Sequence, residues 1–279
     1  MLYRIERILN HNSFMGISGD KNQDCLVMGK GVAFGKKVGQ AIELPADAKV
    51  YSLRELTERG DAKDIVATVS PVCLELANEV LNRGEQEFGK VDRSILFSMA
   101  DHLDFAIRRM QHGEHISNPL TEDIRVMFYK EYKVASCVKE LLQDKLSLAI
   151  DEHEIGYLAL HVHAAIMVEN VSQAMEIART VRKCISLVEQ ETGHTIDVLS
   201  LGYNRLMNHV RYMLARALNG EKLKMNINDY MSVKFPGAYL SAERICRQMK
   251  RSLKLPIPDV EIGYLAMHLE RLIEAETNE

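Results

Sequence analysis

The spacing of apolar residues changes along the chain, and it predicts a short β-rich segment followed by a long helical region. Three runs near the N-terminus are rich in β-branched, aromatic or large apolar residues: 3–9, 13–18 and 25–28. Turn-forming residues separate these runs at 10–12, 19–22 and 29–31. We therefore expect a small antiparallel sheet over roughly the first 55 residues. Because a sheet of this size is marginal by itself, we expect one of its faces to be buried in a homodimer.

Beyond this segment, apolar residues recur at intervals of three and four, which is typical of helices that bury one face. One stripe consists of Ile95, Met99, Leu103, Ala106 and Met110. A second consists of Ile155, Leu158, Val162 and Ile166. Pro119 and the stretch 255–258, which contains two prolines, are expected to interrupt the helices.

An octapeptide in the helical region occurs twice. Residues 154–161 read EIGYLALH and residues 261–268 read EIGYLAMH, so the two copies differ at one position and are displaced by 107 residues. Further residues match at the same displacement without a gap: His102 and His209, Arg109 and Arg216, Phe128 and Phe235, Tyr132 and Tyr239, Ala135 and Ala242. A unit of this length exceeds the period of solenoid repeats and can form its own core. The sequence therefore predicts two duplicated all-α domains, each a helical bundle.

Charge is distributed unevenly over these segments. The formal net charge is -4, but residues 56–170 alone carry 20 acidic and 12 basic side chains. Residues 1–55 carry 8 basic and 6 acidic side chains, and the stretch 30–40 has three lysines and no acid. Composition is otherwise ordinary for a globular protein, with 47% hydrophobic and 27% charged residues. The N-terminal segment is thus the expected place for a polyanion to bind.

Composition also restricts the setting of the protein. The N-terminus has no long apolar stretch of the kind found in signal peptides, and no uncharged stretch is long enough to span a bilayer. The five cysteines are far apart and never form a C-x-x-C pair, which argues against a disulfide framework and a zinc ribbon. We therefore expect a cytoplasmic protein without membrane insertion.

The first candidate site combines glycines, lysines and an aromatic residue within nine positions. Residues 29–31 read GKG and residues 34–37 read FGKK. In RNA-binding loops, glycines permit close approach of the backbone, lysines contact phosphates and a Phe ring stacks on an unpaired base. Asn10 and Asn12 have side chains suited to reading base edges. The simpler alternative, which composition alone favours, is a hairpin whose glycines only form the turn and whose Phe belongs to the core.

The second candidate site is a set of histidines at equivalent positions of the two copies: His102, His161, His209 and His268. Their symmetry suggests a shared role, although packing at the edges of the apolar stripes is the alternative. A neutral imidazole is nucleophilic near neutral pH, so these histidines are candidate phosphoryl acceptors. Arg109 and Arg216 lie near the same helix faces and would attract the added charge.

Catalytic and metal chemistry find less support in the sequence. The rings of an H-x-H pair on a helix point roughly 160° apart, and no H-E-x-x-H or G-x-S-x-G motif is present. We expect no catalytic residue, no metal and no cofactor. A histidine-based phosphotransfer enzyme or a metal-dependent enzyme stays open as the alternative. A DNA-binding activator is a third option, but residues 1–55 show no helix-turn-helix pattern.

The combination of these motifs resembles the BglG/LicT/SacY family of transcription antiterminators, which join a co-antiterminator RNA-binding domain to two PTS regulation domains. The resemblance covers essentially the whole chain and is closest to the glucose-type branch. It implies an RNA-binding domain at 1–58 and PTS regulation domains at 59–170 and 171–279. The motifs that carry it are 9–12, 27–37, 101–107, 118–120 and the two octapeptides.

The resemblance also implies a function. The protein would be a homodimeric regulator that binds a hairpin in nascent mRNA and prevents a terminator from forming. Its partners would be a sugar-specific Enzyme II, which phosphorylates His102 and His161 in the first domain, and the phosphocarrier HPr, which often phosphorylates His209 and His268 in the second. The positions implied to contact RNA are Arg7, Asn10, Asn12, Gly29, Lys30, Gly31 and Phe34.

Overall fold

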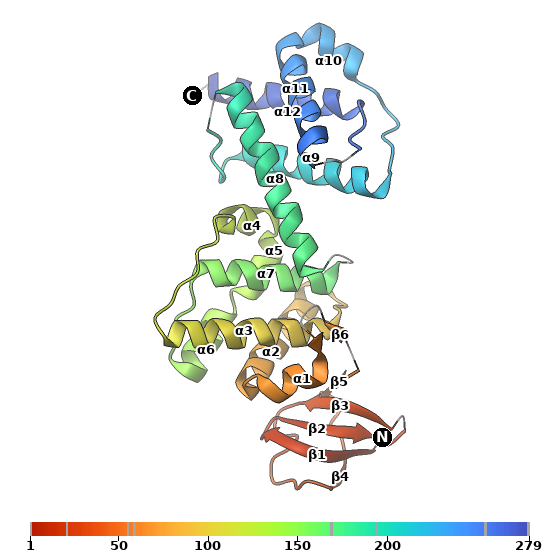
Figure 1. Ribbon diagram of the computed structural model, residues 1–279, viewed down its shortest axis with the longest axis vertical. Helices are drawn as coiled ribbons and strands as arrows, with labels where there is room; N and C mark the ends of the chain where they lie inside the picture. The colour runs from red at the N-terminus through yellow and green to blue at the C-terminus, as the bar shows by residue number, and fades with distance from the viewer. Residues whose placement is uncertain are drawn as a thin grey trace. The chain divides into compact units, whose positions relative to one another are not determined.

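The computed structural model describes residues 2–20, 22–54, 56–57, 60–167, 170–193, 195–253 and 256–277 (Figure 1). The chain forms two compact units. The first consists of Met1–Ser117 and Lys130–Val171, and the second of Asn118–Tyr129 and Ser172–Glu279. Within the described ranges, none of the helices combines the length and apolar character needed to cross a membrane.

The first unit begins with a five-stranded antiparallel sheet of order β4-β1-β2-β3-β5. The three central strands are β1 (Leu2–Asn10), β2 (Ser13–Ser18) and β3 (Gln23–Met28), which confirms the three predicted runs. The edge strands β4 (Ala41–Glu43) and β5 (Lys49–Ser52) were not predicted. With three and four residues they are too short to show an alternating pattern. A two-stranded hairpin, β6 (Leu56–Thr57) and β7 (Gly60–Asp61), follows the sheet.

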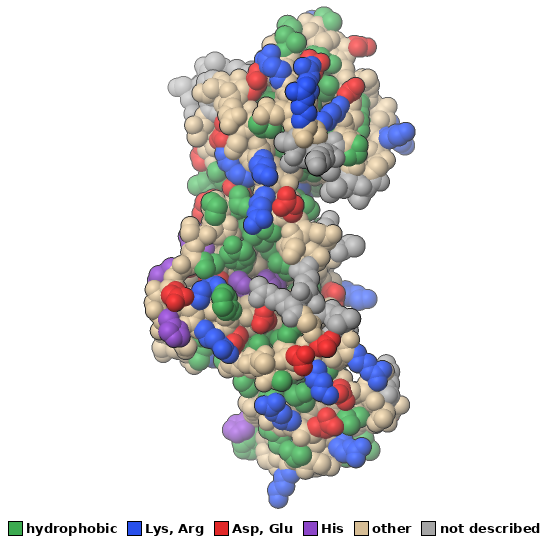
Figure 2. Space-filling view, in the orientation of Figure 1, with side chains coloured by type: hydrophobic (Ala, Val, Ile, Leu, Met, Phe, Trp, Pro, Cys, Tyr) green, Lys and Arg blue, Asp and Glu red, His purple; other side chains and the backbone are tan. Residues whose placement is uncertain are grey.

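The register gives the sheet two distinct faces. Phe14 pairs with Val27, and both belong to a core on one face that the loop after β3 closes with Val32 and Ala33. On the other face Met15 pairs with Leu26, which in turn pairs with Tyr51. These three side chains are also buried within the single chain. On the visible side, basic and acidic side chains are interspersed over the sheet rather than forming a field of one sign (Figure 2).

Helices form the rest of both units, as predicted. The first unit contains α1 (Ala62–Thr68), α2 (Pro71–Phe88), the 3-10 turn η1 (Arg93–Ile95), α3 (Leu96–Gln111), all of α5 (Tyr129–Ala135) except Tyr129, α6 (Val138–Leu146) and α7 (Glu152–Ile166). The second contains α4 (Thr121–Met127), most of α8 (Val171–Thr192), α9 (Leu201–Asn219), α10 (Asn228–Lys234), α11 (Pro236–Leu253) and α12 (Glu261–Thr277). The helices α7 and α9 begin at side-chain caps, from Asp151 and Ser200 respectively.

The sequence repeat appears as a repeat of helices. Shifting α3 by 107 residues gives α9 within two residues at each end, and shifting α4 gives α10. The pair α5 and α6 corresponds to α11. In the first copy the helix is interrupted at residues 136–137, whereas α11 is continuous at the equivalent positions. In the first copy the hydroxyl of Ser136 bonds to the carbonyl of Tyr132 at the break. In the second copy an ion pair between Arg247 and Glu243 supports the continuous helix.

A close contact explains the glycine of the second octapeptide. The backbone N of Gly263 donates to Oδ1 of Asn228, the first residue of α10, at 2.9 Å. A Cβ at residue 263 would lie 2.6 Å from that oxygen. The side chain of Asn228 therefore joins α10 to α12 only because residue 263 lacks a side chain.

Candidate functional site: a loop surface and two histidine centres

Two loops meet at one end of the N-terminal sheet, and we call residues 10–13 and 29–34 the loop surface. The Oδ1 atom of Asn10 accepts hydrogen bonds from the backbone N of Asn12 at 2.8 Å and the hydroxyl of Ser13 at 2.9 Å. This is an Asx turn, in which the side chain supports the tight connection between β1 and β2. The side chain of Asn12 then reaches the second loop, where its Oδ1 accepts from the backbone N of Gly31 at 2.8 Å.

The second loop needs its glycines for different reasons. Gly31 has φ of 66°, a left-handed conformation that is costly for residues with a Cβ. Gly29 lies close to Ala48, and a Cβ at residue 29 would lie 3.3 Å from two atoms of that alanine. Lys30 between them is exposed. The glycines thus allow the loop to bring Lys30 beside Asn12.

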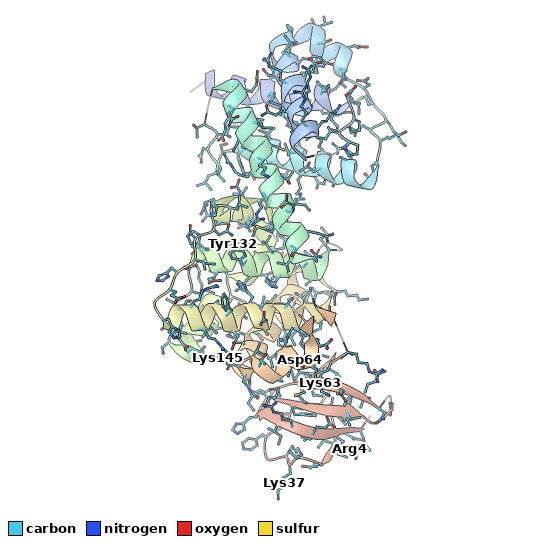
Figure 3. All side chains as sticks on the ribbon, in the orientation of Figure 1. Arg4, Lys37, Lys63, Asp64, Tyr132 and Lys145 are labelled. Carbon is cyan, nitrogen blue, oxygen red and sulfur yellow. The ribbon has the colours of Figure 1, made fainter. Side chains whose placement is uncertain are left out.

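Phe34 is not part of the core: its side chain is 67% exposed. Its ring contacts the ring of His11 edge-on, with centroids 5.3 Å apart. The structure therefore decides against the core alternative for this residue and leaves one face of an aromatic ring on the loop surface. Lys37, three residues further, points away from the sheet into solvent (Figure 3).

Six of the seven positions expected to contact RNA therefore gather on the loop surface: Asn10, Asn12, Gly29, Lys30, Gly31 and Phe34. Arg7 does not share the hydrogen bonds that join them. It lies on β1 opposite Met15 and is exposed. A bulge in the register on each side of this stretch of β1 separates it from Asn10.

The first histidine centre joins α3 to α7. The rings of His102 and His161 lie 5.3 Å apart, and both side chains are buried. The Nε2 atom of His102 is 3.1 Å from a carboxylate oxygen of Glu154, an ion-pair distance, although its direction does not suit a hydrogen bond. Arg109 makes a salt bridge with the other oxygen. Burial favours a raised pKa for Glu154, but its interactions with His102 and Arg109 outweigh burial and lower the pKa.

The tautomer of His161 follows from its neighbour. Its Nδ1 lies 2.9 Å from the backbone carbonyl of Tyr157, which accepts a hydrogen bond. The neutral ring therefore carries its proton on Nδ1 and its lone pair on Nε2.

The second histidine centre joins α9 to α12 and differs from the first. The rings of His209 and His268 are stacked, with centroids 4.6 Å apart. Arg216 binds Glu261 through two hydrogen bonds of 2.8 Å, one to each oxygen of the carboxylate. Among the described atoms, Nε2 of His209 is buried and has no hydrogen-bond partner. Burial, together with repulsion from His268 and Arg216, lowers the pKa of His209 to about 3.

Sequence reasoning missed the carboxylates of these centres. Glu154 and Glu261 are the first residues of the two octapeptides, and both are buried ion-pair partners of the predicted arginines. Their identity at a displacement of 107 residues was the available signal. A second omission, Glu75 of α2, had no comparable signal because its contacts depend on how α2 packs against the sheet.

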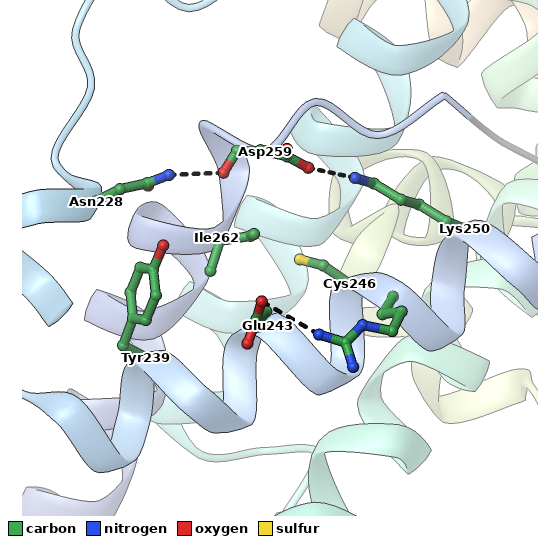
Figure 4. A pocket seen from close by; sticks show the side chains of 8 residues that line it. Asn228, Tyr239, Glu243, Cys246, Lys250, Asp259 and Ile262 are labelled. Carbon is green, nitrogen blue, oxygen red and sulfur yellow. Dashed lines mark hydrogen bonds and ion pairs between the residues drawn. The ribbon is translucent and has the colours of Figure 1, made fainter.

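Other chemistry finds little support in the described ranges. There, no group of three or more His, Cys, Asp or Glu side chains is placed to hold a metal ion. All five cysteines are buried free thiols. A pocket of about 330 Å³ opens in the second unit, but its charged groups pair with one another (Figure 4). Lys250 binds Asp259 and Arg247 binds Glu243, and the other lining residues are Asn228, Tyr239, Cys246 and Ile262.

The small antiparallel sheet with its loop surface, followed by a duplicated helical domain with a histidine pair in each copy, defines a class of modular protein that joins a binding domain to two repeated domains. Two family models match the chain. A CAT RNA binding domain matches residues 3–59, and a PRD domain matches residues 74–165 and again 182–272. The chain therefore belongs to the PRD-domain family, and it carries a CAT RNA-binding domain before its two PRD domains. This confirms the predicted family and fold class.

Relatives with known names match over nearly their whole length. The protein GlcT of Staphylococcus haemolyticus is 28% identical over 271 residues, which cover 96% of this chain and 95% of that protein. The transcription antiterminator LicT of Bacillus subtilis is 25% identical over 275 residues, with 97% and 99% covered. The glcA/glcB genes antiterminator of Staphylococcus carnosus is 24% identical over 278 residues, with 98% and 96% covered.

One solved structure resembles the first part of the chain. The crystal structure of GlcT CAT-PRDI superposes with a TM-score of 0.51 at 26% sequence identity. It covers 60% of this chain and 99% of that one. The similarity to GlcT, in both sequence and structure, agrees with the resemblance to the glucose-type branch.

Proposed function

We propose that this protein is a sugar-responsive transcription antiterminator. It binds a hairpin in nascent mRNA through the loop surface and so prevents an overlapping terminator from forming. The observation that carries the proposal is the contact between Asn12 and Gly31, which joins the two loops and presents Lys30 and the exposed ring of Phe34 together. Cation, aromatic face and amide groups on one surface are the chemistry that single-stranded RNA loops require.

The four histidines are its regulatory phosphoryl acceptors. In each transfer the bond between phosphorus and the donor atom of the phosphorylated partner breaks while an N–P bond forms at the acceptor ring, and the donor group gains a proton to balance the one that the acceptor ring loses. Enzyme II acts on His102 and His161 and silences the protein, whereas HPr acts on His209 and His268. In support, both pairs join two helices of one bundle, so a phosphoryl group of nearly two negative charges placed there strains the packing.

The proposal includes the arrangement of domains. The RNA-binding domain spans 1–58 and the two regulation domains span 59–170 and 171–279, and the active species is a homodimer. The protein acts as a regulator and not as a catalyst. The relatives named as antiterminators support this assignment because they match nearly the whole chain.

RNA binding tests the proposal first. The probe is the transcribed leader that precedes the glcA and glcB genes of Staphylococcus carnosus, together with a pool of hairpins with randomised loops. We expect binding that weakens steeply with salt, and a loss of about tenfold or more for Phe34→Ala because stacking contributes about 1–3 kcal/mol per base. Val38→Ala is the matched control, since Val38 is also exposed and lies on the same loop. Equal affinity of the Phe34 and Val38 variants would argue against the proposed surface.

Phosphorylation tests the regulatory part. The full chain is incubated with phosphorylated HPr or with phosphorylated Enzyme II domains, the modified histidines are mapped, and RNA binding is measured before and after. We expect label on the four histidines and a change in RNA affinity. Absence of label from all four would refute the regulatory mechanism and leave RNA binding intact.

A further inference from the structure

Helix α2 places a carboxylate on the loop surface. One oxygen of Glu75 accepts hydrogen bonds from the side-chain nitrogens of Asn10 at 2.9 Å and Asn12 at 3.0 Å. The other oxygen accepts from Nζ of Lys145, at the end of α6, at 2.6 Å. The side chain of Glu75 is only 15% exposed. Two of the residues assigned to RNA are thus bound by an anion of the same chain.

The orientation of both amides is fixed by other bonds. The Oδ1 atoms of Asn10 and Asn12 accept from Asn12 N, Ser13 Oγ and Gly31 N within the loop surface. The oxygen of each amide therefore accepts hydrogen bonds that hold the loops together, and each NH₂ group can donate hydrogen bonds to a partner outside the loops. Both NH₂ groups are donors, so a ligand that meets them must supply acceptor atoms.

Glu75 is held in place by the packing of α2 on the sheet. One helical turn after Glu75, Oδ1 of Asn78 accepts from the hydroxyl of Tyr51 at 2.6 Å. Further along α2, Glu85 pairs with Lys49 at 3.1 Å. Arg93 donates to both Tyr51 and Asn78. This face of α2 is therefore docked on the sheet along its length, and the carboxylate at its start lies over the two asparagines.

We propose that Glu75 competes with RNA for the amide donors of Asn10 and Asn12, and that the chain with α2 docked on the sheet is its low-affinity state. This inference rests on the proposed function, because the competition exists only if RNA binds the loop surface. A carboxylate presents the same acceptor chemistry to the two NH₂ groups as the base edges and phosphates of RNA. RNA gains these donors only when Glu75 leaves them.

Charge adds to the competition. Burial favours a raised pKa for Glu75, but its hydrogen bonds with Lys145 and Asn12 lower the pKa, so the side chain is an anion at neutral pH. An anion at the loop surface repels phosphates. Lys30 and Phe34 stay exposed in the docked state, so RNA can approach them before the amides are released. The apparent affinity is then the intrinsic affinity reduced by the undocked fraction.

The opposite role is the main alternative. Glu75 would then act as a positioning residue that holds the two amides ready for RNA, and its removal would weaken binding. The two roles predict changes of opposite sign, so a single variant separates them.

The experiment compares full-length Glu75→Ala with the wild type, using the glcA/glcB leader RNA of Staphylococcus carnosus and the best hairpin selected from the randomised pool. We expect Glu75→Ala to bind RNA about five- to tenfold more tightly. Lys145→Ala, which removes the cation that anchors Glu75, should shift affinity in the same direction by a smaller factor. The matched control is Glu79→Ala, which removes the same charge one turn along α2 from a side chain paired with Arg83 instead of the asparagines. Its affinity should stay within twofold of the wild type.

The outcomes are distinguishable. Tighter binding by Glu75→Ala but not by Glu79→Ala supports the competition. If both variants bind RNA more tightly by the same factor, the effect is one of bulk charge, and the proposed competition is overturned. The competition is also overturned if Glu75→Ala binds RNA as the wild type does or more weakly, while the wild type binds RNA. If neither the wild type nor any variant binds either RNA, the proposed function itself fails, and the competition fails with it. Nuclear magnetic resonance of the side-chain amides without RNA is a separate check, because Glu75→Ala must shift the NH₂ signals of Asn10 and Asn12.

Discussion

The hydroxyl of Tyr203 donates a hydrogen bond to the carboxylate of Asp123, which lies 80 residues earlier in the chain. Tyr203 belongs to α9 of the second copy, whereas Asp123 belongs to α4, the counterpart of α10 in the first copy. Both residues are buried in the second unit. Arg211 of α9 adds a hydrogen bond to the carbonyl of Met127 at the end of α4. A helix of the first copy is therefore part of the core of the second unit.

This bond predicts the effect of Tyr203→Phe. The change leaves the buried Asp123 carboxylate without its closest donor, which should lower the free energy of unfolding of the second unit by about 1–3 kcal/mol. Tyr212→Phe on the same helix is the control and should change it by less than about 0.5 kcal/mol, because Tyr212 is 56% exposed. Urea unfolding of both variants gives the comparison. Similar stabilities would mean that the bond contributes little.

The lowered pKa of His209 predicts that acid destabilises the second unit. Above its ordinary pKa of 6.5 the ring is neutral in both the folded and the unfolded chain, so it contributes nothing. Below pH 6.5 the ring of His209 is protonated in the unfolded chain, whereas in the folded chain it stays neutral down to about pH 3. The free energy of unfolding therefore falls as the pH is lowered through this range. Between about pH 7.5 and about pH 5.5 this amounts to about 1.4 kcal/mol. Over that interval the free energy of unfolding of His209→Gln should therefore fall by about 1.4 kcal/mol less than that of the wild type. Urea unfolding at both pH values measures the difference, and equal losses in the two proteins would contradict the prediction.

The buried carboxylates of the two histidine centres predict a large loss of stability on neutralisation. Glu154→Gln leaves Arg109 with a weak partner, and Glu261→Gln does the same to Arg216. Each should destabilise the protein by about 3 kcal/mol, because breaking a buried pair leaves a charge without compensation. The control is Glu122→Gln, which removes an exposed pair with Arg125 and should cost less than about 0.5 kcal/mol.

The pH dependence of Glu154 has a definite sign. Because its pKa is lowered in the folded chain, its contribution to stability is complete above the ordinary value of 4.5 and is lost as pH falls through the folded value. Glu154→Gln should therefore flatten the decline of stability below about pH 4.5. An unchanged acid profile would show that Glu154 is not the titrating partner.

The cysteines predict slow reaction with thiol reagents. Burial raises the pKa of Cys73, Cys184 and Cys246 to about 12, so hardly any thiolate exists near neutral pH. Labelling of the native chain with an aromatic disulfide reagent should be slow, and five thiols should react rapidly in urea. Val38→Cys supplies an exposed thiol as a positive control. Fast labelling of the native wild type would show that the cores open readily.

Local patterns predicted a good part of this protein. Short runs of β-branched, aromatic or large apolar residues between turn-forming residues predicted β1 to β3. Apolar residues at intervals of three and four predicted the helices that carry Met99, Leu103 and Leu158, all of which are buried. The repeat predicted that histidines stand at equivalent positions in the two copies. These features depend on residues close in sequence or on direct comparison of two segments, so the sequence displays them.

The remaining features depend on contacts between distant segments. The strands β4 and β5 owe their positions to pairing with β1 and β3 rather than to their own short sequences. Nothing near Glu75 shows that it meets Asn10 and Asn12, more than 60 residues away. The two histidine centres differ because Glu154 contacts both His102 and Arg109, whereas Glu261 binds Arg216 with both oxygens. This difference depends on how the helices pack.

The placement of α4 has a consequence for how the protein is made. A ribosome releases residues 118–129 before any of the chain from Ser172 onward, so α4 emerges long before Tyr203 and Arg211 exist. Until α9 has been synthesised, Asp123 lacks the hydroxyl of Tyr203 and the carbonyl of Met127 lacks the side chain of Arg211, although Asp123, Ile124 and Met127 are all buried in the finished protein. The first unit can close around the gap, because its own chain resumes at Lys130. The order of synthesis therefore leaves α4 without its partners in α9 until the second unit is complete.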